Sequence, residues 1–199
     1  MRGYTKIHKN FEGNLILMSK ALGMAEFNTV SSGIAAADLM IKTAEVDIIE
    51  SATVCPGKYI VIISGELSAV QASVEAAKAF KPDRLVDSFV LGAPHESIFP
   101  AIYATAQPEN VQALGVMESF SAASAIVAAD AAAKTALVEL IELRLARGMC
   151  GKSYLLLTGS VSAVTAAIER ANQEAGEKGM FLDSSVIPNP DKKLWDSIL

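Results

Sequence analysis

The stretch AAADLMIKTAEVDIIE, residues 35–50, decides the fold because it recurs as VAADAAAKTALVELIE at residues 127–142. At a constant shift of 92 positions, residues 21–50 and 113–142 are identical at 15 of 30 positions without a gap. Self-similarity at a fixed spacing is typical of a duplicated structural unit. The chain therefore contains two copies of one domain of roughly 90 residues, which is too few copies for a solenoid.

The correspondence continues towards the C-terminus of each copy. GKYIVIISGELSAV at 57–70 matches GKSYLLLTGSVSAV at 151–164, after a two-residue insertion in the second copy. Further on, LVDSFVLGAP at 85–94 matches FLDSSVIPNP at 181–190. The repeat therefore accounts for nearly all of the chain after its first twenty residues.

We divide the chain accordingly into three parts. Residues 1–17 have no counterpart in the second copy. We expect them to be a disordered extension or residues that precede a true start at Met18, rather than a docking segment. The first domain spans residues 18–107 and the second 108–199, and a polar linker at 103–112 joins them.

Hydrophobic periodicity in the first copy predicts six elements in the order β-α-β-β-α-β. They are a strand at Ala21–Phe27, a helix at Ser32–Ala44, a strand pair at Val46–Val54 and Lys58–Ser64, a helix at Ser68–Phe80 and a strand at Arg84–Leu91. The first helix should bury Ile34, Ala37, Ile41 and Ala44, and the second Leu67, Val70, Val74 and Ala77. The predicted fold class is α+β, with two tandem ferredoxin-like sandwiches whose helices cover a mostly antiparallel sheet.

The composition of the chain limits the cellular compartment and the binding partners that we expect for it. The chain has 199 residues, 51% of them hydrophobic, and its net charge of −5 offers no basic face to nucleic acid. No apolar run approaches the roughly 18 residues of a membrane span, and residues 14–17 are too short for the apolar region of a signal peptide. The two cysteines are far apart, unlike a secreted disulfide framework. We expect a cytoplasmic protein in a reducing environment that binds neither nucleic acid nor membrane.

Several short motifs carry a resemblance to a known family. Each copy opens with ALG-x-x-E, has AAD-x-x-x-K-T-A on its first helix, and has G-K-[YS] after the loop between its middle strands. A β-α-β-β-α-β domain with these motifs resembles the bacterial microcompartment shell domain, and two fused copies resemble the tandem, trimeric class of that family. The resemblance implies a structural protein rather than an enzyme. Three chains would form a homotrimer, a pseudohexameric tile with a central pore, and tiles would pack edge to edge with other shell proteins in the microcompartment shell.

The loop ATVCPGKYIV, residues 52–61, places a cysteine on a Pro-Gly turn. Together with AGEKGMFLDSSVIPNPDKKLW near the C-terminus, it is similar to a subtype of propanediol-utilising compartments that carries an iron–sulfur cluster at its pore. The resemblance implies that Cys55 from each chain is the ligand and that one cluster, of the 4Fe-4S type, is bound per trimer. One cysteine would suffice because threefold symmetry supplies three of the four thiolates that a cubane commonly takes. Such a cluster would conduct electrons across the shell, with redox enzymes inside the compartment as partners.

The second pore loop has its cysteine at a different position. Met149 aligns with Cys55, and Cys150 follows one residue later. Cys150 could be a second ligand, an oxidation partner of Cys55, or a small residue that fills the loop, and a free cysteine is often such a residue. The predicted pore loops comprise Val54, Cys55, Pro56, Gly57, Met149, Cys150 and Gly151.

Lys42 and Lys134 occupy equivalent positions on the first helix of each copy. The resemblance implies that this lysine lies at the tile edge and contacts the next tile, whereas the simpler alternative is a solvated lysine. The family often has an arginine after the last strand, where this chain has Ala93 and Asn189. This departure indicates a different neighbour at the edge.

Other motifs support no catalytic function. GMCGKS lacks the first glycine of a phosphate-binding loop, because Ala146 stands there. His8 and His95 have no cysteine or carboxylate at the spacing of metal ligands, and no serine is paired with a base. Two alternatives to the cluster-bearing tile remain open: a tile whose pore passes metabolites without a cluster, and a soluble regulator that binds a metabolite between domains.

Overall fold

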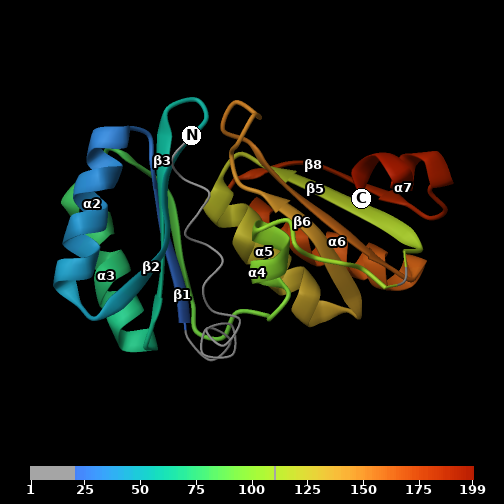
Figure 1. Ribbon diagram of the computed structural model, residues 1–199, viewed down its shortest axis with the longest axis horizontal. Coiled ribbons are helices and arrows are strands. Elements are labelled where there is room, and N and C mark those ends of the chain that lie inside the picture. Colours follow the sequence, from blue (N-terminus) through green and yellow to red (C-terminus); the bar gives the residue numbers. More distant parts are fainter. Residues whose placement is uncertain (1–20, 110) are drawn as a thin grey trace.

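Each half of the chain forms a four-stranded antiparallel sheet with two long helices on one face (Figure 1). The computed structural model describes residues 21–109 and 111–199, so the predicted extension at 1–17 lies outside the described residues. The elements of the first half are β1 (Ala21–Phe27), α2 (Val30–Thr43), β2 (Val46–Val54), β3 (Lys58–Gly65), α3 (Leu67–Phe80) and β4 (Leu85–Leu91). Those of the second half are β5 (Ala113–Ser119), α5 (Ala122–Thr135), β6 (Val138–Arg144), β7 (Ser153–Gly159), α6 (Val161–Glu177) and β8 (Phe181–Ile187). The predicted order β-α-β-β-α-β and the α+β class are confirmed in both halves.

The two sheets share their strand order and their register. The order is β2-β3-β1-β4 in the first sheet and β6-β7-β5-β8 in the second. Ala21 pairs with Gly65 in the first, and Ala113 pairs with Gly159 in the second. Both central strands even share a register irregularity towards the last strand, after Glu26 and after Glu118. The duplication in the sequence is therefore a duplication of the fold in detail.

A glycine in each central strand allows a helix to approach the sheet closely. A Cβ atom at Gly23 would lie 2.6 Å from Val70 Cγ1 of α3, and one at Gly115 would lie 2.9 Å from Val164 Cγ1 of α6. Neither distance leaves room for a methyl group. The glycine of the ALG motif is thus retained in both halves because α3 and α6 pack directly over it.

Two short helices were not predicted from the sequence. They are α4 (Ile98–Ile102) and α7 (Lys192–Ile198), and each follows the last strand of its half. Ile98 and Ala101 of α4 are fully buried, and α4 lies beside α5 between the two sheets (Figure 1). In the second half, Trp195 of α7 packs against Leu114 on the outward face of the second sheet. Each short helix therefore covers the face that the long helices leave open.

The structure contradicts the apolar stripe predicted for α2. Ile34 and Ile41 are 54% and 45% exposed, and Ala44 lies beyond the helix, whereas Ala37 is buried together with Met40. Periodicity does not identify the buried side here because most residues of this helix are small or apolar, so more than one stripe fits the pattern. The stripe of α3 is confirmed at Val70, Val74 and Ala77, but Leu67 is exposed.

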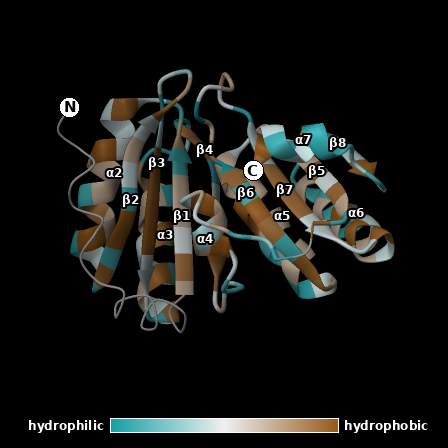
Figure 2. Cartoon of the chain, turned by 45° about the vertical axis from the view of Figure 1, so that its right-hand side comes forward, coloured by the Kyte–Doolittle hydropathy of each residue, from teal (hydrophilic) through white to brown (hydrophobic). Residues whose placement is uncertain are grey.

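One hydrophobic cluster joins the two halves. It includes Leu22, Met24 and Ile62 of the first sheet, Ile98 of α4, and Ile126 of α5. Figure 2 shows hydrophobic residues along the strands of both sheets and on the helices between them. A separate cluster lies between the first sheet and its own helices. Among the described residues, no helix is long and apolar enough to cross a membrane.

Candidate functional site

The two predicted pore loops lie against each other within one chain. The amide N of Cys55 donates a hydrogen bond to the carbonyl O of Ala146 at 2.9 Å. Gly151 fits into this contact because it has no side chain: a Cβ atom there would lie 3.0 Å from the Cys55 carbonyl O and 3.0 Å from Pro56 Cδ. Its φ of +87° is also a conformation that favours glycine. The two loops thus lie together within one chain, while their position at a pore stays a prediction.

Both cysteines of the site are free thiols. Cys55 is half-buried and precedes a cis peptide bond to Pro56, whereas Cys150 is exposed with a φ of +51°. Among the described residues of one chain, no group of three or more His, Cys, Asp or Glu side chains could hold a metal ion. A metal site at these loops would therefore need residues from more than one chain.

An ion pair of the first half, between Lys58 and Glu26, makes further hydrogen bonds to the second half. Lys58 Nζ lies 2.8 Å from Glu26 Oε1, and it also donates to the carbonyl O atoms of Gly151 at 3.1 Å and Phe120 at 3.3 Å. The Glu26 carboxylate is fully buried, and its second oxygen accepts from the amide N of Ala122 at 2.9 Å. Ala122 begins α5, so the carboxylate sits where the helix dipole favours negative charge.

Asp87 of β4 adds a second contact between the first sheet and the start of α5, and we call this interface between the halves the seam. Its Oδ2 accepts hydrogen bonds from Ser121 Oγ at 2.5 Å and Ser124 Oγ at 2.6 Å, and its Oδ1 lies 3.2 Å from Lys178 Nζ. Burial works to raise the pKa of Asp87, but the two serine hydrogen bonds and Lys178 outweigh it and lower the pKa below the ordinary 3.8. The first sheet thus holds the N-terminal turn of α5 through two carboxylates, those of Glu26 and Asp87.

No role for these residues was predicted from the sequence. Glu26 and Lys58 belong to the motifs ALG-x-x-E and G-K, which carry the family resemblance. Their recurrence as Glu118 and Lys152 was the signal that could have pointed to a charged pair. Lys152 Nζ indeed lies 3.4 Å from Glu118 Oε2 in the second half.

The two predicted edge lysines have different surroundings. Lys42 is paired with Asp38 at 2.6 Å on the exposed side of α2. Lys134 is paired with Asp130 at 2.6 Å and also donates to the carbonyl O of Ala93 at 2.7 Å. The structure therefore places Lys134 at the seam between the halves, and contact of either lysine with a neighbouring tile stays a prediction.

His95 lies near a carboxylate and a serine but does not form a catalytic triad with them. Asp130 Oδ1 accepts from the backbone N of His95 at 2.7 Å, whereas the ring atom Nδ1 lies 2.7 Å from Ser97 Oγ. The carboxylate thus fixes the loop rather than orienting the imidazole, which a general base would require.

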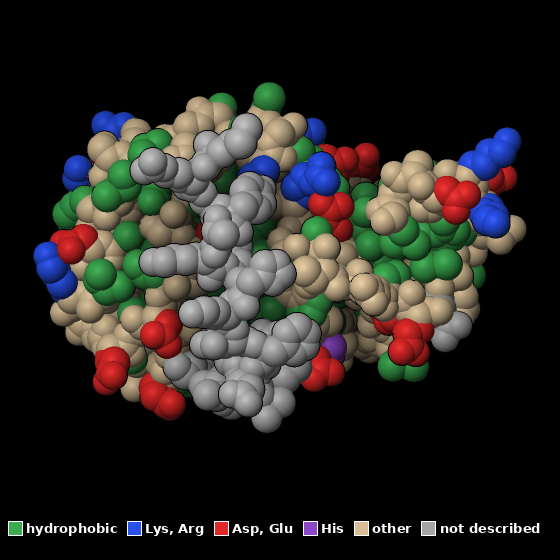
Figure 3. All heavy atoms as spheres, in the orientation of Figure 1, with side chains coloured by type: hydrophobic (Ala, Val, Ile, Leu, Met, Phe, Trp, Pro, Cys, Tyr) green, Lys and Arg blue, Asp and Glu red, His purple; other side chains and the backbone are tan. Residues whose placement is uncertain are grey.

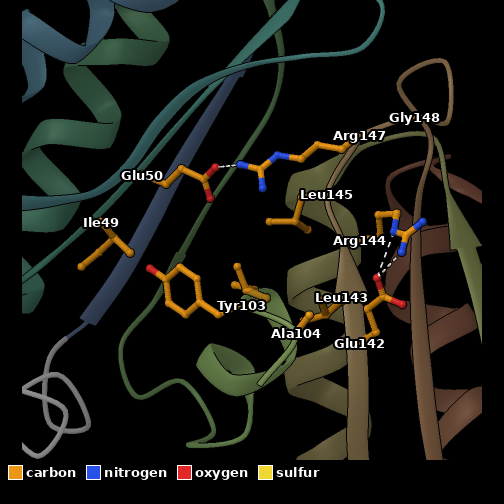
Figure 4. Close-up of a pocket in the computed structure, with 11 residues that line it drawn as sticks. Ile49, Glu50, Tyr103, Ala104, Glu142, Leu143, Arg144, Leu145, Arg147 and Gly148 are labelled. Atoms are coloured by element: carbon orange, nitrogen blue, oxygen red, sulfur yellow. Dashed lines mark hydrogen bonds and ion pairs between the residues drawn. The ribbon is translucent and has the colours of Figure 1, made fainter. Parts of the chain in front are cut away.

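A pocket of about 640 Å³ opens between the halves beside the loops (Figure 4). Its walls come from β2, the end of α4, β6 and the following loop. Glu50 and Arg147 form an ion pair across it, and Glu142 and Arg144 form another at 2.8 Å. Because its own side chains balance the charges, this pocket shows no preference for an ionic ligand.

The comparisons with known proteins agree with this geometry. The profile of the BMC domain matches residues 21–94 and again 113–190. The chain belongs to the bacterial microcompartment shell protein family. This confirms the predicted family and its tandem arrangement, while the proposed boundaries at 18–107 and 108–199 stay predictions.

Relatives match over most of the chain. The bacterial microcompartment shell protein PduT of Citrobacter freundii is 39% identical over 178 residues, which cover 89% of this chain and 97% of that protein. The carboxysome assembly protein CcmO of Synechococcus elongatus is 30% identical over 89% of this chain and 68% of its own length. A crystal structure of a microcompartment protein from Desulfitobacterium hafniense has a TM-score of 0.78 and 44% identity, covering 89% of this chain and 98% of that one.

A more distant structure shares the fold alone. The fused permuted hexameric shell protein of the RMM microcompartment has a TM-score of 0.61 at 23% identity, covering 79% of this chain and 82% of that one. Together these comparisons establish a structural shell protein of a bacterial microcompartment. They do not address what the pore loops bind.

Proposed function

We propose that three chains assemble into one pseudohexameric shell tile whose pore carries a 4Fe-4S cluster on three Cys55 thiolates. Membership of the shell family and similarity to the shell protein PduT support the tile, and the loop motif around Cys55 resembles that of propanediol-utilising compartments. The observation that supports the proposal is the contact between the two pore loops, in which the amide N of Cys55 donates to the carbonyl O of Ala146. Six such loops, two from each chain, would then surround the axis of a trimer.

The residues present fit a shared cluster rather than one held by a single chain. Two thiols from one chain are too few for a cubane, which commonly takes four thiolates. Three copies of Cys55 would supply three thiolates and leave one iron to another ligand. The hydrogen bond from the Cys55 amide to Ala146 fixes the loop that carries the thiol, so little ordering would be needed on binding.

A bound cluster would supply one-electron transfer through the shell. The protein would supply the position of the thiolates and, by filling the pore, a barrier to metabolites. Redox enzymes inside the compartment would be the partners on one side of the shell. Tiles would join other shell proteins edge to edge, with Lys42 and Lys134 at that boundary.

Cys150 is close enough in the fold to require its own test. It precedes Gly151, which packs against the Cys55 carbonyl group, so the second thiol belongs to the same loop cluster. We assign the cluster to Cys55 because the resemblance concerns the first loop. Cys150 is then a neighbour whose replacement should leave the iron content unchanged.

The experiment is to measure iron and acid-labile sulfide per trimer after strictly anaerobic purification, with EPR of the reduced sample. We expect about four irons per trimer in the native chain and in Cys150→Ser, and almost none in Cys55→Ser. Iron-free native protein, even after reconstitution, would contradict the proposal. The tile would then be one whose pore passes metabolites, with Cys55 as a lining residue.

A further inference from the structure

The backbone of Cys55 lies between the two ends of the second pore loop. Its amide N donates to the carbonyl O of Ala146 at 2.9 Å, and a Cβ atom added at Gly151 would lie 3.0 Å from its carbonyl O. Cys150 directly precedes Gly151, and consecutive Cα atoms are only about 3.8 Å apart. The only two cysteines of the chain therefore lie in loops that touch each other, although they come from different halves.

The ends of the second loop are fixed, whereas its middle is open. Ala146 and Gly151 are buried, and Gly148 and Cys150 between them are exposed. A Cβ atom added at Gly148, or at Gly57 in the first loop, would meet no atom from elsewhere in the described chain within 4 Å. A disulfide requires Cα atoms roughly 4.4–6.8 Å apart. Because the tips of both loops are free of packing against the described residues, they can adjust to that spacing without disturbing the core.

The two thiols differ in their exposure to solvent. Cys150 is exposed and Cys55 is half-buried, and both are free. Figure 1 shows the two loops at the same end of the two sheets, and Figure 3 shows Lys and Arg side chains on the surface in this upper part of the view. A water-soluble oxidant therefore reaches Cys150 first. An exposed thiol with a second thiol nearby is the arrangement typical of redox-responsive cysteines.

We propose that Cys55 and Cys150 form a reversible disulfide within one chain when the pore loops hold no iron. The oxidant is a small soluble disulfide, such as oxidised glutathione. The Cys150 thiolate attacks one sulfur of this oxidant, which forms a mixed disulfide and releases one glutathione thiolate. The Cys55 thiolate then attacks the Cys150 sulfur, and the second glutathione leaves. In sum, the two protein thiols lose two electrons and two protons, and one glutathione disulfide becomes two glutathione thiols.

The disulfide would act as a switch on the proposed cluster site. It occupies the sulfur atom of Cys55, so an oxidised chain takes up no iron until a reductant restores both thiols. It also prevents the oxidation of Cys55 to the sulfinic acid, which thiols do not reverse. The effect on iron uptake rests on the proposed function. The disulfide itself goes beyond that function, because it forms within a single chain and requires neither a trimer nor a cluster.

The test follows iron-free protein in buffers with increasing ratios of oxidised to reduced glutathione, and circular dichroism verifies that each variant is folded. Mass spectrometry of the alkylated native chain should show a species about 2 Da lighter than the reduced form, and a digest should contain one crosslinked peptide with both cysteines. The matched controls are Cys55→Ser and Cys150→Ser. Each should instead gain the mass of one glutathione, because its remaining thiol has no second thiol to displace that group.

Two results would overturn this inference. In the first, the native chain gains only glutathione, as the single variants do. In the second, the disulfides join different chains, which would appear as covalent dimers on a non-reducing denaturing gel.

Iron reconstitution separates this inference from the proposed function. Oxidised native protein should take up at least about tenfold less iron than the same sample after reduction, because iron binds the thiolate form of cysteine. Equal uptake before and after reduction would contradict the switch. A chain that forms the disulfide but binds no iron when reduced would retain the disulfide and contradict the cluster. A chain that binds iron but forms no disulfide would contradict this inference alone.

Discussion

The α2 and α5 helices share an ancestor, a length and most of their motif, yet they occupy different environments. α5 is buried along most of its length, and α2 exposes about half of its residues, including two isoleucines. The difference does not come from the composition of the helices, since Ile34 and Ile126 are the same residue at equivalent positions. It arises because the two domains of one chain share a single interface. That interface covers α5, whereas the equivalent side of α2 has no domain against it.

The internal seam also has features that the open surfaces lack. Arg147, which pairs with Glu50 across the pocket, lies in the two-residue insertion of the second pore loop and has no counterpart in the first. The carboxylate equivalent to Glu50 is Glu142, which is paired instead with Arg144 of its own strand. An interface between copies would therefore lack this ion pair. We expect it to be weaker than the interface between the halves of one chain.

The largest effect should come from comparing Glu26→Gln with Glu118→Gln. Glu26→Gln leaves Lys58, which is only 16% exposed, without its carboxylate, and we expect a loss of about 3–5 kcal/mol in the free energy of unfolding. In urea titrations this loss should not depend on chain concentration. The loss in Glu118→Gln should be only about 0.2–1 kcal/mol, because Glu118 and its partner Lys152 are both partly exposed. Equal losses in the two variants would show that the two glutamates have the same role in the single chain.

The next comparison is Asp87→Asn with Asp183→Asn. Near neutral pH, Asp87→Asn should lower the free energy of unfolding by about 1.5–3 kcal/mol, because two hydroxyl hydrogen bonds to a charged group are weakened. In dilute samples Asp183→Asn should lower it by less than about 0.5 kcal/mol.

The pH dependence sharpens this comparison. Because folding lowers the pKa of Asp87, its ionised form stabilises the chain at pH values above the ordinary 3.8, and this contribution is lost as pH falls through the folded pKa. Urea titrations between neutral pH and about pH 2.5 should show a smaller acid destabilisation in Asp87→Asn than in the native chain. A parallel decline in the two proteins would contradict the assignment.

Two equivalent glycines of the pore loops provide the third comparison. Gly57 and Gly151 have φ values of +103° and +87°, but only Gly151 has neighbours within 4 Å of an added Cβ atom. Gly57→Ala should cost about 1 kcal/mol through backbone strain, and Gly151→Ala about 2–3 kcal/mol because it also separates the loops. Thermal unfolding would measure both. A similar shift in the two variants would show that the loop contact adds no stability.

The smallest effect concerns the two arginines beside the pocket. Arg147→Ala breaks the ion pair that joins the halves, and Arg144→Ala breaks one within a sheet. Both arginines are about half exposed, so each change should cost only about 0.2–1 kcal/mol. The loss in Arg147→Ala should shrink in high salt, which screens the pair. Thermal unfolding in low and high salt tests this, and a loss well above 1 kcal/mol would show that the seam depends on this pair.

Only part of the candidate site could be predicted from the repeat. The repeat predicts that the loops of Cys55 and Cys150 share one pore, and the structure shows these loops in contact within one chain, whereas the pore stays a prediction. The buried pair of Glu26 and Lys58 was not predicted. A carboxylate in a strand gives no indication of burial by itself, since the amide N of Ala122, which donates to Glu26, lies 96 positions away in the sequence.

The sequence by itself determined the family, the duplication and the order of strands and helices, because local periodicity and repetition are properties of neighbouring residues. The tertiary structure alone decided which side of an alanine-rich helix is buried. Ile34 and Ile126 have the same local sequence pattern, and the second is inside because another half of the chain lies against it. It also decided that α4 fills the space between the sheets. Both results depend on packing between distant segments, which local patterns do not encode.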